Sequence, residues 1–132
     1  MYINRRQVLL QIMAKSLEKL TGESLVESAL PELLSDNHTW RVIAVGKAAA
    51  SMACGAINCL GSENIDQLLV ITKSGHVTPW LSRLDQAEIV ESAHPIPDER
   101  SLLAGKKLLE CIQQQFTNPV LFLISGGASS LV

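Results

Sequence analysis

The sequence contains few aromatic residues and no concentration of basic charge. Aromatic side chains make up 4% of its 132 residues, and 11 Lys and Arg against 13 Asp and Glu leave a formal net charge of −2. Proteins that bind nucleic acid commonly present a basic surface, often with aromatic side chains that stack on bases. The composition therefore argues against a nucleic-acid partner.

Long apolar stretches are also absent. A helix needs roughly 20 consecutive, mostly apolar residues to cross a bilayer, and no stretch of this chain approaches that length. Residues 1–7 include two arginines, but they lack the apolar segment and the small-residue cleavage site of a secretory signal. We therefore expect a cytoplasmic protein with no membrane partner.

Cysteines and histidines are few and are not arranged as metal ligands. The three cysteines form no C-x-x-C pair, and the three histidines lie far apart in the sequence. Protein zinc sites usually draw on closely spaced ligands, so the sequence does not predict one. We expect the cysteines, which are Cys54, Cys59 and Cys111, to be small buried apolar residues.

What the chain does have is a hydrophobic fraction of 47%, which fits a globular domain with its own core. Apolar runs that predict strands alternate with segments that predict helices. Strands are expected at 41–45, 67–72, 87–91 (partly exposed or at an edge) and 119–124, and helices at 4–20, from Ser24 to Pro31, at 47–60 and after Asp98. The alternation predicts a Rossmann-like α/β fold, a three-layer α/β/α domain with a mainly parallel sheet.

Two of these helices carry a prediction about packing. The segment 47–60 is apolar nearly all round and rich in small residues, which is typical of a helix packed on a sheet and covered on its outer side. In the helix after Asp98, one face is expected to carry the apolar contacts. Its members are Leu102, Gly105, Leu109, Ile112 and Phe116.

A loop with polar or glycine residues follows each predicted strand. The loops begin at Gly46-Lys47, at Lys73-Ser74-Gly75-His76, at His94-Pro95-Ile96-Pro97-Asp98 and at Ser125-Gly126-Gly127. In parallel α/β sheets, ligands bind outside the carboxyl ends of the strands. We therefore expect all four loops to meet at one edge of the sheet and to form the functional site.

Two of these loops have the chemistry of an anion site. Lys47 is predicted in the first turn of its helix, where the positive end of the helix dipole makes a lysine unfavourable by about 0.3–1 kcal/mol unless an anion compensates. The alternative is a lysine extended into solvent. After the last strand, glycines and hydroxyl side chains can turn donors toward a phosphate; these residues are Ser125, Gly126, Gly127, Ala128, Ser129 and Ser130.

Three better-known motifs are excluded by the residues present. Lys47 is followed by Ala48 and lacks the earlier glycine of a Walker A loop, and Gly46-Lys47-Ala48 does not supply the dinucleotide pattern G-x-G-x-x-G. The serine-hydrolase pattern G-x-S-x-G fails because Leu131 stands where its second glycine would be.

Four short segments, in this order and spacing, resemble the N-terminal part of the glycerate 2-kinase family, a two-domain type whose members are often labelled hydroxypyruvate reductases. The segments are Val45-Gly46-Lys47-Ala48-Ala49, Thr72-Lys73-Ser74-Gly75-His76, Ala93-His94-Pro95-Ile96-Pro97-Asp98 and Leu123-Ile124-Ser125-Gly126-Gly127-Ala128-Ser129-Ser130-Leu131. The resemblance covers the chain from about residue 5 to its end.

The resemblance implies ATP-dependent phosphorylation of D-glycerate at its 2-hydroxyl, with a divalent metal, usually magnesium. Lys47 matches the family's active-site lysine, and residues 125–130 match its phosphate loop. Ala128 departs from the family, which more often has glycine there. Family enzymes continue well beyond Val132 into a second domain, so residues 1–132 are expected to be a truncated N-terminal α/β domain, inactive as an isolated fragment. The resemblance identifies neither a general base nor metal ligands.

Several roles remain open. Lys73 and His76 either contact an anion or form a solvated turn, and His94 either lines the site with Gly46 or bonds to the backbone. Asp98 is a helix cap or a metal ligand. Hydroxypyruvate reduction and non-catalytic anion binding are the alternative functions, and the sheet edge formed by the last strand can favour homo-oligomers.

Overall fold

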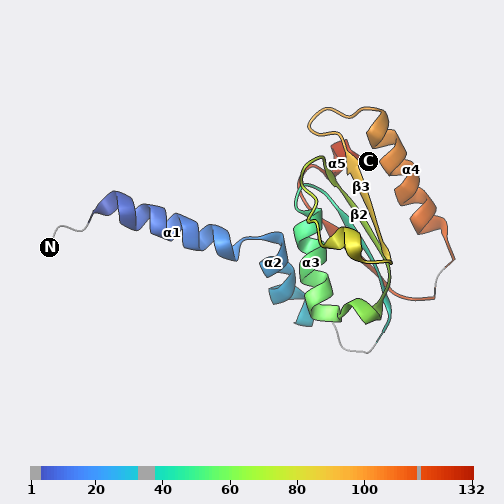
Figure 1. Cartoon of the computed structure of the whole chain (residues 1–132), viewed down its shortest axis with the longest axis horizontal. Helices are drawn as coiled ribbons and strands as arrows, with labels where there is room; N and C mark the ends of the chain where they lie inside the picture. The colour runs from blue at the N-terminus through green and yellow to red at the C-terminus, as the bar shows by residue number, and fades with distance from the viewer. Residues whose placement is uncertain (1–3, 33–37, 116) are drawn as a thin grey trace.

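A computed structural model describes residues 4–32, 38–115 and 117–132 (Figure 1). Its helices and strands alternate along the chain as the sequence predicts. The main elements are α1 (Arg5–Lys19), α2 (Gly22–Ala29), β1 (Trp40–Val45), α3 (Ala49–Leu60), β2 (Ile65–Lys73), β3 (Ala87–Ser92), α4 (Glu99–Gln113), β4 (Val120–Ile124) and α5 (Ala128–Leu131). Short 3-10 turns lie at Leu30–Glu32, Ser62–Asn64 and Leu81–Arg83.

The strands of the described residues form one parallel sheet in the order β3-β2-β1-β4. Val45 at the end of β1 pairs with Ile71 of β2 on one side and with Ile124 of β4 on the other. Lys73 at the end of β2 pairs with Ser92 at the end of β3. The predicted parallel sheet is confirmed, and β3 is an edge strand as expected.

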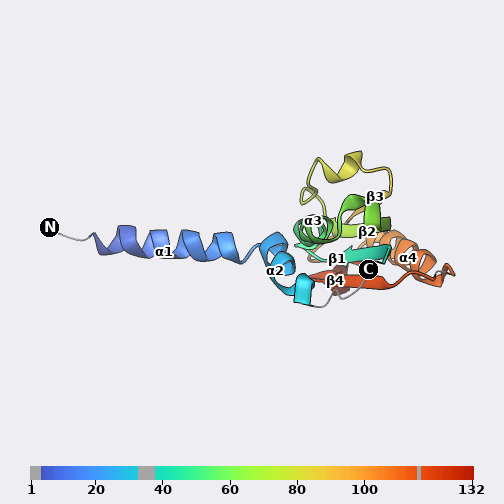
Figure 2. The same cartoon turned by 90° about the horizontal axis from the view of Figure 1, so that it is seen from below.

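Helices cover both faces of the sheet, which completes the predicted three layers (Figures 1 and 2). One core lies under α2 and α3 and includes Val42, Ala44, Leu68 and Val70. The other lies under α4 and α5 and includes the neighbouring strand residues that point the opposite way, Ile43, Val45, Leu69 and Ile71. The alternation of buried side chains along β1 and β2 therefore divides the core between the two helical layers.

The small residues of α3 allow α2 to pack directly on its outer side. A Cβ added to Gly55 would lie 2.6 Å from the carbonyl oxygen of Glu23 in α2, and one added to Gly22 would lie 2.8 Å from Met52 Cγ. Ala53 and Ala56 are fully buried. The prediction of a covered helix is confirmed, and even a methyl group at Gly55 would push the two helices apart.

The predicted apolar face of α4 is wrong. The structure buries Ser101, Ala104 and Cys111, whereas Leu102 is 70% exposed and Leu109 56% exposed. Bonds from the first turn of α4 to the end of β3 and to α5 set the rotation of the helix and leave its leucines outward. The fifth predicted member of the face, Phe116, lies outside the described residues.

Other differences concern helix ends. α2 begins at Gly22 with Thr21 as its N-cap, not at Ser24, because the Thr21 side chain accepts a hydrogen bond from the Ser24 N–H. α1 buries none of its side chains and projects away from the sheet in both views (Figures 1 and 2). No helix in the described part of the chain has the length and apolarity that a membrane crossing requires.

Candidate functional site

The parallel sheet brings the four predicted loops to one edge. Each loop begins at the carboxyl end of its strand: Gly46 after β1, Ser74 after β2, Ala93 after β3 and Ser125 after β4. Because β3, β2, β1 and β4 are neighbours in that order, the loops lie in the same order along the edge. The predicted clustering is therefore present in the fold.

The loops after β1 and β4 are bonded together into one unit. The Ser125 N–H donates to the Val45 carbonyl at 2.9 Å, and the Lys47 N–H donates to the Gly126 carbonyl at 3.1 Å. Thr72, fully buried in β2, donates from its hydroxyl to the Gly46 carbonyl at 3.0 Å. These bonds fix the backbone that carries Lys47 to both neighbouring strands.

Gly46 is required at the centre of this unit. It is buried and its φ is +129°, a conformation that side chains rarely adopt. A Cβ there would collide with the Ser125 side chain and would lie 2.6 Å from the Ser125 carbonyl oxygen. The close approach of the two loops therefore depends on the missing side chain at this position.

The Ser125 hydroxyl holds the start of α3. It accepts a hydrogen bond from the Ala48 N–H at 3.0 Å, and Ala48 is the N-cap residue of α3, whose own side chain makes no cap bond. Helix N-termini leave backbone N–H groups that need such acceptors. Ser125, in the loop after β4, thus supplies the cap that α3 lacks, and this bond was not predicted from the sequence.

Lys47 is exposed and stands just before the N-cap of α3, not in the first helical turn as predicted. The turn at Gly46–Ala48 is held by Ser125 in the loop after β4, and the helix therefore starts only at Ala49. The side chain of Lys47 nevertheless lies over the last loop. Its Cγ is 3.3 Å from the point where a Cβ on Gly127 would be.

The side chain of His94, in the loop after β3, approaches the same glycine. Its Nε2 and Cδ2 atoms are each 2.8 Å from the point that a Cβ on Gly127 would occupy, and the φ of this glycine is +92°. A side chain at residue 127 would therefore displace the imidazole or the lysine. Gly127 has no side chain and so lets His94 and Lys47 both approach the loop after β4.

The electrostatics show that four basic groups share this edge. Partial burial lowers the pKa of His94 below its usual value, and the nearby positive charges of Lys47, Lys73 and His76 lower it further. Lys73 is the last residue of β2, and the other three groups lie in the loops after β1, β2 and β3. The structure thus places Lys47 and His94 beside the loop at 125–127, with Lys73 and His76 near His94.

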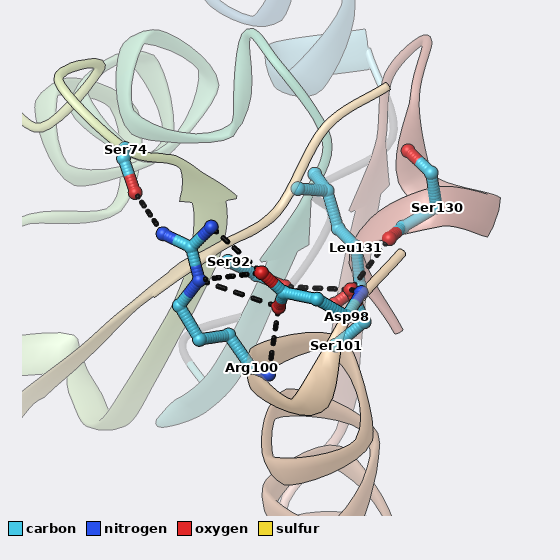
Figure 3. A network of polar contacts seen from close by, with 7 residues as sticks. All are labelled: Ser74, Ser92, Asp98, Arg100, Ser101, Ser130 and Leu131. Atoms are coloured by element: carbon cyan, nitrogen blue, oxygen red, sulfur yellow. Dashed lines mark hydrogen bonds and ion pairs between the residues drawn. The ribbon is translucent and has the colours of Figure 1, made fainter. Parts of the chain in front are cut away.

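The Asp98 side chain is engaged by Arg100 in the first turn of α4. Its side chain accepts from the Arg100 N–H at 2.8 Å and forms an ion pair with the Arg100 guanidinium, also at 2.8 Å (Figure 3). It is the N-cap of α4 in a capping box with Ser101. The hydrogen bond from the Arg100 side chain holds the pKa of the Asp98 carboxyl below its usual value. Its contacts are those of a helix cap.

A buried pair of serines, not predicted from the sequence, anchors the end of the loop that follows β4 (Figure 3). The Ser92 hydroxyl donates to the Leu131 carbonyl at 2.8 Å, and the Ser101 hydroxyl donates to the Ser130 carbonyl at 2.8 Å. Ser92 is fully buried and Ser101 is 4% exposed. These bonds tie α5 to β3 and α4, and nothing in the residues around Ser92 signals such a partner.

The remaining residues of the predicted loop have different surroundings. Gly126 and Ser129 are exposed, and a Cβ added to Gly126 would meet nothing within 4 Å. Ser130 donates from its hydroxyl to the Gly127 carbonyl at 2.9 Å, while Ala128 begins α5. Open access to the loop backbone therefore lies at Gly126 and Ser129.

Residues 8–132 match the family described as a domain of unknown function (DUF4147). A D-glycerate 2-kinase from Thermotoga maritima is 39% identical over 127 residues, which are 96% of this chain and 29% of the relative. A relative from Agrobacterium vitis, provisionally named a hydroxypyruvate reductase, is 33% identical over 98% of this chain and 28% of its own length.

The fold is also that of a solved relative. The crystal structure of glycerate kinase from Thermotoga maritima has a TM-score of 0.81 to this chain at 38% identity, covering 95% of this chain and 29% of that chain. The chain therefore spans less than a third of the length of these relatives. It belongs to the DUF4147 family and resembles the N-terminal part of the glycerate 2-kinases.

Proposed function

We propose that this chain supplies the phosphoryl-transfer edge of a glycerate 2-kinase, which phosphorylates D-glycerate with ATP. The observation that carries the proposal is the approach of Lys47 and His94 to Gly127 in the loop after β4, with Lys73 and His76 close enough to His94 to act on its charge. The proposal is also supported by similarity, because the Thermotoga maritima relative is named a D-glycerate 2-kinase.

The chemistry fits the groups present. In phosphoryl transfer, negative charge spreads over the phosphoryl oxygens, and catalysis rests mainly on positioning and electrostatic stabilisation. Lys47 can neutralise this charge. Its backbone N–H is bonded to the Gly126 carbonyl in the loop after β4, while its side chain stays exposed. Lys73, His76 and His94 add positive charge or donors around it, and Gly46 and Asp98 act through the backbone that they position.

The ATP phosphates would lie at the loop 125–130. A Cβ added to Gly126 would meet nothing within 4 Å, so a phosphate can approach the backbone there without a steric barrier. The hydroxyl of Ser129 is exposed beside it. Ser125 and Ser130 use their hydroxyls in bonds to Ala48 and Gly127, so their contribution to binding is the shape of the loop.

The described residues do not identify ligands for magnesium. They contain no group of three or more acidic, histidine or cysteine side chains that could hold a metal ion. Asp98, the carboxylate nearest in sequence to His94 in the loop after β3, is paired with Arg100. We therefore assign no step to a metal.

We propose further that these residues are one part of a larger, two-domain enzyme and do not turn over substrate alone. Apolar side chains such as Ile124 (67% exposed) and Phe122 (45% exposed) lie open on β4, which is an edge strand of the described sheet. Such surface is suited to further chain or to a second copy. A cytoplasmic location stays a prediction from the sequence.

The test is binding and turnover by the 132-residue chain. Inorganic phosphate and ATP are expected to shift the amide resonances of 46–48 and 125–130, and Lys47→Ala is expected to weaken phosphate binding about tenfold. Lys106→Ala, which removes an exposed lysine from α4, is the matched control. Equal weakening by both variants, or no shifts at these loops, would contradict the site.

Turnover separates the alternatives. A coupled ADP-release assay with D-glycerate, ATP and magnesium is expected to show no turnover by the isolated chain. Without a second domain, the site neither aligns the reactants nor excludes water. Robust turnover would show that no second domain is needed. Oxidation of NADH by hydroxypyruvate would instead support the reductase name carried by the Agrobacterium vitis relative.

A further inference from the structure

His94 differs from the other basic groups at this edge in what it can do with a proton. The ammonium groups of Lys47 and Lys73 donate hydrogen bonds but accept none, whereas an imidazole gains and loses a proton near neutral pH. Partial burial and the charges of Lys47, Lys73 and His76 all favour the neutral ring at His94. A neutral imidazole has one nitrogen that accepts a hydrogen bond.

The carboxylates of the neighbouring loops are already engaged. Glu91, on β3, accepts a hydrogen bond from the Gly75 N–H at 2.6 Å. Both oxygens of Asp98 accept bonds from the Arg100 side chain (Figure 3). His94, by contrast, packs against Gly127, where Lys47 also lies. Of the proton acceptors named here, His94 is therefore the one that lies beside both Lys47 and the loop at 125–130.

We propose that His94 recognises the acceptor hydroxyl of the substrate, accepting its hydrogen bond and then its proton during phosphoryl transfer. This inference rests on the proposed kinase function. The hydroxyl proton moves to the imidazole nitrogen while the hydroxyl oxygen forms a bond to the γ-phosphorus of the nucleoside triphosphate. The bond from that phosphorus to the bridging oxygen breaks, and the diphosphate leaves with the electron pair.

The geometry supports this division of roles. Lys47 and His94 both approach Gly127, from the loops after β1 and β3, so a phosphoryl group bound at the open backbone of the adjacent Gly126 would have the lysine and the imidazole as neighbours. The lysine then faces the charge that develops on the phosphoryl oxygens, and the imidazole faces the attacking oxygen. Ser92, buried two residues before His94, fixes this loop by its bond to the Leu131 carbonyl.

The test compares two acids of equal charge on the unmodified 132-residue chain. D-glycerate has a 2-hydroxyl, and 3-hydroxypropionate is the same molecule without it. Their carboxylates affect the charge of His94 alike, so a difference in the pKa of His94 between the two complexes reports the hydroxyl. The imidazole is followed by NMR titration, with its signal assigned by its loss in His94→Gln.

A hydroxyl that donates to the neutral ring opposes protonation, so the pKa of His94 is expected to be lower with D-glycerate than with 3-hydroxypropionate. The affinity preference for D-glycerate is expected to be about fivefold. It should be present above the pKa of His94, where the ring is neutral, and fade as the pH falls through that value.

Variants give an independent readout. His94→Leu is expected to lose the preference for D-glycerate, and His94→Gln, whose amide oxygen accepts hydrogen bonds, to keep part of it. His38→Leu, at an exposed position before the amino end of β1 and so at the opposite edge of the sheet, is the matched control and should keep the preference.

Equal pKa values of His94 in the two complexes, or a preference that survives His94→Leu, would overturn the role of His94 while leaving the anion site intact. The absence of any shift at 46–48, 73–76 and 125–130 with phosphate, ATP and both acids would instead overturn the proposed function, and this inference with it.

Discussion

Gly46→Ala is the substitution for which the structure makes the sharpest stability prediction. Two costs combine at this position. The φ of +129° strains any residue with a Cβ, at about 1–3 kcal/mol. The new methyl group would also collide with Ser125 in the loop after β4, and overpacking of this kind typically costs about 1–3 kcal/mol.

The expected loss in the free energy of unfolding is therefore about 2–6 kcal/mol. This is a large share of the roughly 5–15 kcal/mol that stabilises an ordinary domain. Equilibrium denaturation in guanidinium chloride, followed by far-UV circular dichroism, measures it. The collision also separates the loops that carry Lys47 and Gly126, so phosphate binding should weaken in the fraction that remains folded.

Gly75→Ala is the matched control. Gly75 also has a positive φ, +80°, but a Cβ there would meet nothing within 4 Å. It therefore incurs the backbone strain alone, about 1–3 kcal/mol. The difference between the two variants isolates the contact with Ser125. If Gly46→Ala destabilises the chain no more than Gly75→Ala, the close packing of the two loops is not as described.

Three further predictions concern the same edge. Gly126→Ala should leave the free energy of unfolding within about 1 kcal/mol of the parent, since its Cβ meets nothing; it should weaken phosphate binding seen by NMR, and unchanged binding would remove Gly126 from the phosphate site. Ser92→Ala leaves the Leu131 carbonyl without its buried donor and should destabilise the chain by about 1–3 kcal/mol in the same denaturation assay, against little change for the exposed Ser16→Ala. Asp98→Asn keeps a helix-capping side chain but removes the ion pair with Arg100. Because that partner lowers the pKa of Asp98 in the folded state, the stability difference between parent and variant should be full above the ordinary aspartate pKa of 3.8 and shrink as the pH falls through the lower folded value; a difference independent of pH would argue against the pair.

The sequence by itself determined the alternation of strands and helices, and with it the position of the site. Four apolar runs, each followed by a loop with glycine, proline or polar residues, are a local pattern that needs no knowledge of contacts. Once the strands are parallel, their carboxyl ends must lie at one edge. This is why Gly46, Lys73, His94 and Ser125 could be placed together before their distances were known.

Only the tertiary structure decided how those loops fit together. The bond between Ser125 and Ala48 joins residues 77 positions apart, and it both caps α3 and delays its start beyond Lys47. The outward leucines of α4 follow from Ser101, whose hydroxyl bonds to Ser130. The approach of His94 and Lys47 to Gly127 depends on three different strands. Contacts between distant segments carry no signal in local periodicity, because they depend on how whole elements pack against the sheet.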